Sequence, residues 1–160
     1  LHGQEVGEWF PAKDQYQGVP YAPVIITELK TGAWGVQWYE AEFIGILDGE
    51  EVARKKYAAN PVPTKLTIEA DDQELMADGS DATRVVFKVV DQAGNLMPYL
   101  NEVIEFEVEG PGTIIGPKLT GLIGGCIATW VKTTGEEGTI KIKGVTTRFE
   151  SETVEIKVKK

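Results

Sequence analysis

Hydrophobic and polar residues alternate along most of the second half of the chain. In residues 103–109 the apolar side chains of Ile104, Phe106 and Val108 point to one side, and three glutamates point to the other. Successive side chains of a strand point to opposite faces, so this period of two indicates half-buried strands of an antiparallel sheet. The same alternation recurs in residues 66–70, 82–90, 139–143 and 154–159.

Turn segments rich in Gly, Asp and Asn separate these runs at short intervals, at residues 77–80, 91–95 and 134–138. About seven short strands within a hundred residues, without a helical period, are typical of an immunoglobulin-like β-sandwich. We therefore predict an all-β chain in which residues 61–160 form a complete, antiparallel, immunoglobulin-like domain.

The single cysteine, Cys126, and one tryptophan lie in the same alternating run. Cys126, Ala128 and Trp130 share one face of that strand. This face is predicted to point inward, with Trp130 as the core tryptophan of the sandwich and Cys126 as a small buried hydrophobic residue rather than a nucleophile.

Residues 1–60 differ in composition, because they hold three of the four tryptophans and four of the five tyrosines. Residues 39–57 are predicted to form a hairpin around Asp48-Gly49, which is one of the strongest two-residue turn signals. The prolines of residues 60–63 then interrupt any ladder. Two or three strands are too few for a complete sandwich, and the domain boundary is predicted at residues 60–63.

A run of six glycines in residues 110–125 raises the alternative of a phosphate-binding loop. Gly116 and Gly121 have the required spacing, but Leu122 and Ile123 stand where the loop needs Lys and Ser or Thr. The glycines are therefore expected to provide turns and tight bends between strands.

The net charge of −9 is spread along the chain and argues against a nucleic-acid partner, which needs clustered Lys and Arg. No apolar run approaches the length of a membrane helix, and no signal peptide is visible. One cysteine excludes an internal disulfide, and the only histidine is His2, so a catalytic triad or a histidine-rich metal site is not expected. No cofactor and no metal are predicted.

The acidic pairs 50–51, 71–72 and 136–137 are adjacent in sequence. Neighbouring side chains of an extended chain point to opposite faces, whereas glycoside hydrolysis needs two carboxyl groups facing each other across a cleft. The pairs are therefore interpreted as solvated turns. Residues 78–81 carry oxygen ligands without the spacing of a helix-loop-helix calcium site, which leaves a calcium ion at the edge of the sandwich as an open alternative.

The aromatic residues Trp34, Trp38 and Tyr39 are the candidate binding residues. Their rings could stack on the apolar face of a sugar, or they could fill the core of the first domain and its contacts with neighbouring domains. Packing is the interpretation that we favour, because a tryptophan is costly to leave in water.

Several motifs of the second half are similar to those of known domains. Residues 77–87 and 90–95 are similar to bacterial immunoglobulin-like domains in general. The more particular motifs are residues 108–112 (VEGPG), 115–117 (IGP), 124–125 (GG) and 130–136 (WVKTTGE). Together they resemble the C-terminal sandwich of glycoside hydrolase family 2 β-galactosidases. Residues 1–7, 20–24 and 46–54 resemble the sandwich that precedes it in this family, although His2 replaces the usual asparagine.

This resemblance implies a larger bacterial enzyme whose two catalytic glutamates lie on a (β/α)₈ barrel. The chain has no alternation of strands and helices, so no catalytic residue can be assigned to it. The implied role is a non-catalytic accessory module whose partners are the catalytic barrel and the neighbouring β-domains. The alternatives are a carbohydrate-binding module and a surface spacer of the adhesin type.

The resemblance also implies that the chain begins inside a domain whose first strands are missing, so that residues 1–60 are the C-terminal part of a truncated β-sandwich domain. The strands of residues 1–60 would then have unpaired edges, through which the chain is expected to self-associate.

Overall fold

The computed structural model of the chain describes residues 7–26 and 40–160, and every named element within them is a β-strand. This confirms the all-β prediction. The chain divides into two compact units, Leu1–Asn60 and Pro61–Lys160. In the described part of the chain, no helix is long and apolar enough to cross a membrane.

The first unit contains an antiparallel hairpin of strands β1 (Ala41–Leu47) and β2 (Glu50–Tyr57). The two turn residues between the strands, Asp48 and Gly49, have positive φ angles of 52° and 85°. Positive φ at both positions gives a turn whose twist matches that of the strands, so the predicted hairpin is confirmed. The rings of Phe43 and Tyr57 pack edge to face, with their centroids 6.0 Å apart.

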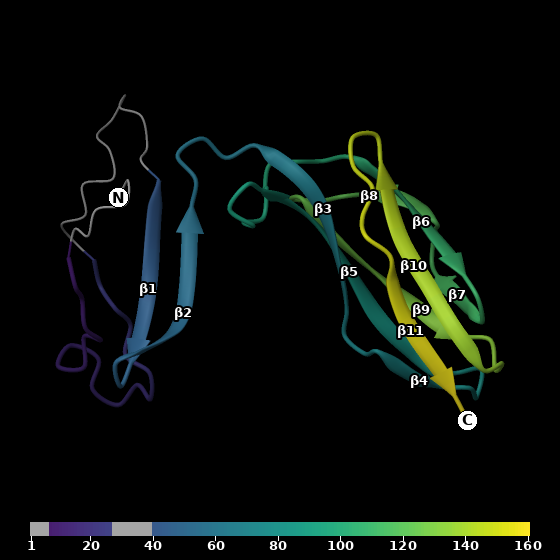
Figure 1. The fold of residues 1–160 in the computed structure, drawn as a ribbon, viewed down its shortest axis with the longest axis horizontal. Helices are drawn as coiled ribbons and strands as arrows, with labels where there is room; N and C mark the ends of the chain where they lie inside the picture. The colour runs from purple at the N-terminus through teal and green to yellow at the C-terminus, as the bar shows by residue number, and fades with distance from the viewer. Residues whose placement is uncertain (1–6, 27–39) are drawn as a thin grey trace. The chain divides into compact units, whose positions relative to one another are not determined.

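The second unit is a β-sandwich (Figure 1). Its five-stranded sheet has the order β4-β11-β10-β6-β8, and its four-stranded sheet has the order β3-β5-β9-β7. Neighbouring strands are antiparallel except for β4 and β11, which run parallel. The strands are β3 (Pro63–Ala70), β4 (Glu74–Met76), β5 (Ala82–Asp91), β6 (Val103–Glu109), β7 (Gly112–Ile115), β8 (Leu119–Gly121), β9 (Cys126–Thr133), β10 (Gly138–Thr146) and β11 (Val154–Lys159).

The core lies between the two sheets and follows the predicted alternation. Phe87 of β5 and Phe106 of β6 come from opposite sheets, and their rings pack with centroids 5.0 Å apart. Gly144 of β10 leaves the space for the Phe87 ring, because a Cβ there would lie 2.7 Å from it. Further buried core side chains are those of Leu66, Val85, Val89, Ile104, Ile140, Ile142 and Ile156.

The prediction that Trp130 is a core residue is wrong, because half of its side chain is exposed (50%). Register explains the error. Directly opposite residues of paired strands point to the same face, and β5 pairs buried Val85 with Thr129 but exposed Arg84 with Trp130. The inner face of β9 therefore carries Thr129, Val131 and Thr133. The Thr133 hydroxyl donates a hydrogen bond to the backbone carbonyl of Met76.

The outward face of β9 also holds Cys126, which is only partly buried. The prediction of a buried cysteine is therefore wrong as well. The hydrophobic pattern gave the wrong inner face for β9, because threonine side chains occupy inner positions that this pattern assigns to the outside.

Two glycines of the run at residues 110–125 allow close backbone contacts inside the sandwich. Gly110 has a φ of 85°, and a Cβ there would lie 2.1 Å from the Thr139 carbonyl oxygen. Gly125 has a φ of 79°, and a Cβ there would lie 2.2 Å from the Met97 carbonyl oxygen. These two glycines thus allow tight backbone bends between strands, as the sequence predicts.

Candidate functional site

The predicted sugar-stacking residues Trp34, Trp38 and Tyr39 lie outside the described residues. Their role as a stacking platform stays a prediction. The candidate sites that can be built from the structure are a polar network on the hairpin, an acidic turn, a groove at the edge of the sandwich and an exposed aromatic row.

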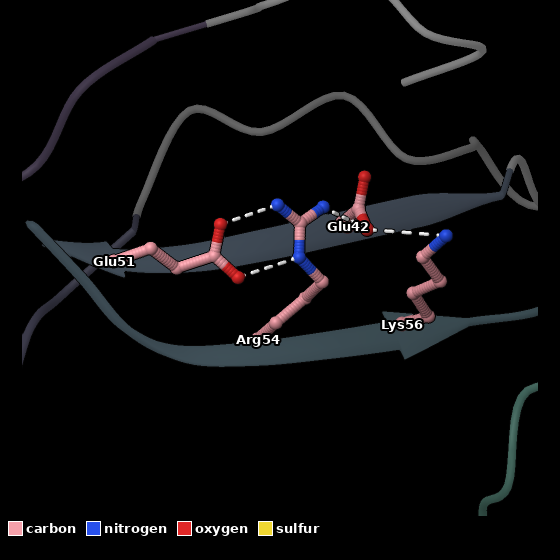
Figure 2. A network of polar contacts seen from close by, with 4 residues as sticks. All are labelled: Glu42, Glu51, Arg54 and Lys56. Carbon is pink, nitrogen blue, oxygen red and sulfur yellow. Dashed lines mark hydrogen bonds and ion pairs between the residues drawn. The ribbon is translucent and has the colours of Figure 1, made fainter.

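A network of charged side chains covers one face of the hairpin (Figure 2). The register of β1 and β2 pairs Glu42 with Lys56 and Ile44 with Arg54, which places the charged groups on the same face. The Arg54 guanidinium donates through Nε and Nη2 to the Glu51 carboxylate, at 2.7 and 2.5 Å, and through Nη1 to Glu42 Oε1 at 2.6 Å. Lys56 Nζ lies 3.2 Å from the same Glu42 oxygen.

This network lowers the pKa of both carboxyl groups. The hydrogen bond from Arg54 is the largest cause for each, and Lys56 adds to the effect on Glu42. In turn, the two carboxylates raise the pKa of Arg54. A general acid near neutral pH needs the opposite shift, a raised carboxyl pKa. The network is therefore suited to holding β1 and β2 in register rather than to proton transfer.

The carboxylates of the acidic turn, Asp78 and Asp81, are bound to the backbone around them. Asp78 Oδ1 accepts from the amides of Ser80 and Asp81, at 2.7 and 2.8 Å, and these bonds lower its pKa. Asp81 accepts from the amides of Met76 and Ala82 at 2.7 and 3.0 Å. These carboxylates close the turn between β4 and β5, which agrees with the turn that the sequence predicts at residues 77–80.

In the predicted acidic pairs 71–72 and 136–137, carboxylates also bind neighbouring groups. Asp72 exchanges hydrogen bonds with Thr83, whereas its neighbour Asp71 pairs with Arg84 at 2.8 Å. Glu137 accepts from the backbone amide of Lys160. Within residues 7–26 and 40–160, no three or more His, Cys, Asp or Glu side chains group closely enough to hold a metal ion.

A shallow groove of about 410 Å³ lies between the edge strand β3 and the start of β11. Its two carboxylates are both paired with lysines of neighbouring strands, Glu69 with Lys88 at 3.6 Å and Glu155 with Lys141 at 3.2 Å. The groove therefore offers no carboxyl group that is free of a cation. Its lining consists of Ile68, Glu69, Ala70, Gln73, Val154 and Glu155.

The aromatic row crosses the outer face of the four-stranded sheet and is the feature that sequence reasoning missed. Ile115 of β7, Trp130 of β9 and Arg84 of β5 are directly opposite one another in the register. Trp130 and Ile115 are both half-exposed, at 50% and 52%. The signal that could have revealed the row was the spacing of Thr129 and Thr133, which stand two positions before and after Val131 and point inward with it.

Comparison with known proteins identifies the second unit. Residues 66–155 match the profile of the family described as glycoside hydrolase family 2 C-terminal domain 5. A β-galactosidase of Thermoanaerobacterium thermosulfurigenes is 43% identical over 121 residues, which cover 72% of this chain and 17% of that protein. A β-galactosidase of Rhizobium radiobacter is 35% identical over 127 residues, which cover 79% of this chain and 92% of that sequence.

Solved structures show the same fold. A family 2 glycosyl hydrolase from Bacteroides cellulosilyticus matches with a TM-score of 0.62 at 21% identity, over 76% of this chain and 17% of that one. A β-glycosidase from Bacteroides vulgatus matches with a TM-score of 0.62 at 19% identity, over 88% of this chain and 18% of that one.

The chain therefore spans about a sixth of the length of several curated relatives that it matches, at 17% and 16% of two of them. Its similarity to them is not confined to the sandwich. A β-galactosidase of Thermoanaerobacter pseudethanolicus is 36% identical over 150 residues, more than Pro61–Lys160 contains. From the profile match and the sequence relatives, the chain belongs to the C-terminal β-domains of β-galactosidase-like glycoside hydrolases of family 2, through its C-terminal domain 5.

Proposed function

We propose that this chain is a non-catalytic accessory module of a family 2 β-galactosidase, an enzyme that hydrolyses terminal β-galactosides. The observation that carries the proposal is the 43% identity to a segment covering only 17% of a protein named β-galactosidase. Such a segment is a small part of a much larger protein. Its partners would be the catalytic barrel and the neighbouring β-domains of the same enzyme.

The chemistry of the described carboxylates supports a non-catalytic role. Hydrolysis of a glycosidic bond uses one carboxylic acid to protonate the leaving group and one carboxylate as base or nucleophile. Four of the described carboxyl groups, those of Glu42, Glu51, Glu74 and Asp78, have a lowered pKa. A lowered pKa suits ion pairs and turns, and it does not suit the acid of such a pair.

We further propose that residues 1–60 are the C-terminal part of a β-sandwich whose remaining strands lie outside the described residues. The hairpin exposes apolar side chains on both of its faces, which supports this interpretation. Two strands alone bury too little apolar surface for independent stability. The exposed side chains are those of Ile44, Ile46, Leu47, Val52 and Tyr57.

A chimera tests the accessory role. The segment of the Thermoanaerobacterium thermosulfurigenes enzyme that matches this chain is replaced by this chain, and a second variant lacks the segment. We expect the chimera to hydrolyse a nitrophenyl β-galactoside at a rate close to that of the parent enzyme. The deletion variant is expected to lose activity faster on heating, because removing the module exposes the surface that it covers.

Two grafted variants serve as matched controls. Phe106→Ala removes a buried core ring and should make the chimera behave like the deletion variant, whereas Glu105→Ala on the solvent face should leave it unchanged. If the deletion variant keeps the full rate and thermal half-life of the parent enzyme, the accessory role is contradicted.

A further inference from the structure

The aromatic row on the four-stranded sheet has no role in the accessory function proposed above. The row of Ile115, Trp130 and Arg84 crosses three strands, and the ion pair of Arg84 continues it to Asp71. Directly opposite side chains of paired strands lie about 5 Å apart, so the first three residues form a continuous strip. Arg84 donates from Nε and Nη2 to the Asp71 carboxylate at 2.8 and 3.2 Å, which extends the strip to the end of β3.

The row places a half-exposed indole beside a charged pair. The indole of Trp130 stands between small or polar neighbours on its own strand, Ala128 and Lys132. Beside it, the Arg84 and Asp71 side chains are 50% and 45% exposed, so both remain open to further hydrogen bonds. A guanidinium donates hydrogen bonds and a carboxylate accepts them, which lets the pair bind hydroxyl groups of either orientation.

A pyranose ring has the complementary surface. One face of the ring presents C–H groups, which suit an indole face, whereas its edge carries hydroxyl groups that both donate and accept. A ring stacked on Trp130 would have its edge hydroxyls directed toward the neighbouring strand, where the Arg84–Asp71 pair lies.

The size of the apolar patch distinguishes a sugar from a protein partner. Ile115 and Trp130 are the only large exposed hydrophobic residues on the strands of this sheet. A half-exposed tryptophan presents roughly 100 Å² and the pair about 200 Å². A stable protein interface buries about 800 Å² on each partner around an apolar centre. The patch is far below that size and matches one or two sugar rings.

We propose that the outer face of β5, β7 and β9 is a carbohydrate-binding site for neutral oligosaccharides, with Trp130 as the stacking residue. Arg84 and Asp71 provide the hydrogen bonds to the hydroxyl groups, and Ile115 extends the apolar surface beside the indole. This site is separate from the predicted aromatic residues of the first unit, and it does not depend on the accessory role.

A titration of the isotope-labelled chain with a β-linked galactotetraose tests the site, with the Trp130 indole amide followed by NMR. We expect saturable shifts of this amide and of the Arg84 side chain, in the millimolar range that suits one stacked ring and a few hydrogen bonds. Trp130→Ala should weaken the affinity by about tenfold or more, because it removes the apolar surface on which the sugar ring would stack. Trp130→Phe, which keeps a smaller ring, should retain part of the affinity.

Two controls separate this site from other aromatic residues and from loss of folding. Tyr99→Ala removes a side chain that is 95% exposed on a loop and should leave the titration unchanged. The double variant Trp34→Ala, Trp38→Ala should still show the Trp130 shifts. The amide spectrum of each variant reports whether the sandwich is folded.

Three outcomes would overturn the proposal. They are the absence of shifts at the Trp130 indole with the sugar in large excess, an affinity that Trp130→Ala leaves unchanged, and sedimentation showing that Trp130→Ala instead abolishes association between protein molecules. The last result would assign the row to a protein contact.

Discussion

Single side chains in the sandwich differ in how much they stabilise the fold, according to the face of the sheet on which they lie. Phe106 is 2% exposed and packs against Phe87 across the two sheets, whereas Trp130 is 50% exposed on the outer face of its sheet. Residue type alone would rank the tryptophan as the larger contribution to folding. Burial reverses that order, because only surface removed from water stabilises the folded state.

Phe106→Ala should therefore destabilise the chain by about 3–5 kcal/mol, the range for a large buried aromatic. Trp130→Ala should cost well under half of that, and Glu105→Ala on the solvent face under about 0.5 kcal/mol. Urea unfolding of the three variants measures the order. A larger loss for Trp130→Ala than for Phe106→Ala would mean that the register of β9 is wrong.

The charged network of the hairpin gives a prediction at the same scale. Arg54 holds the pKa of Glu42 and Glu51 below the ordinary value of 4.5. A carboxyl group with a lower pKa in the folded chain stabilises the fold at a pH above its unfolded value, and this stabilisation is lost as the pH falls through the folded pKa. The ion pairs should therefore persist at pH 4.5 and break only below it.

An NMR titration of the two side-chain carboxyl carbons measures these midpoints. We expect both below 4.5 in the unaltered chain and a rise of both in Arg54→Met, which removes the largest cause of each shift. Midpoints that do not change in Arg54→Met would show that the network does not exist in solution.

At the scale of elements, the alternation of residue types was enough to assign most strands. β5, β6, β10 and β11 have the predicted inner faces, because their apolar side chains alternate with charged ones. β9 was predicted with its faces exchanged, because uncharged threonines occupy its inner positions. The parallel pairing of short β4 with β11 could not be predicted, since three residues carry no periodicity.

The candidate sites were less predictable than the strands. The aromatic row depends on which residues of β5, β7 and β9 are opposite one another, and a sequence pattern gives no register between strands. The Arg54 network depends in the same way on the register of the hairpin, although its turn was evident from Asp48 and Gly49.

Hydrogen exchange should distinguish the central strands of the sandwich from the strands of the hairpin. β5, β6 and β10 lie inside sheets and carry fully buried side chains, so their amides should be protected up to the free energy of global unfolding. All residues of β2 are exposed, and its amides and those of β1 should exchange clearly faster. Equal protection in a monomeric sample would contradict the proposal that the hairpin belongs to an incomplete domain.

For the whole molecule, the two units are expected to behave differently in isolation. The sandwich Pro61–Lys160 has its own core of buried residues from both sheets, and the hairpin unit exposes apolar residues on two faces. Exposed apolar surface and unpaired strand edges favour association with other chains. Self-association would therefore originate in residues 1–60.

Light scattering after size exclusion tests this origin. Residues 61–160 should give the mass of a monomer at every concentration, whereas the mass of the full chain should rise with concentration. A full chain that stays monomeric would indicate that residues 1–60 form a complete unit, and association of the fragment alone would assign the contact to the sandwich.

The most direct test of the non-catalytic role is the turnover of a nitrophenyl β-galactoside by the purified chain. The account predicts no hydrolysis above the rate of buffer, because Glu42, Glu51, Glu74 and Asp78, whose pKa values are lowered, stand in ion pairs or a turn. The Thermoanaerobacterium thermosulfurigenes enzyme, assayed in parallel, supplies the positive control. Hydrolysis that persists at constant specific activity through repeated purification would contradict the account.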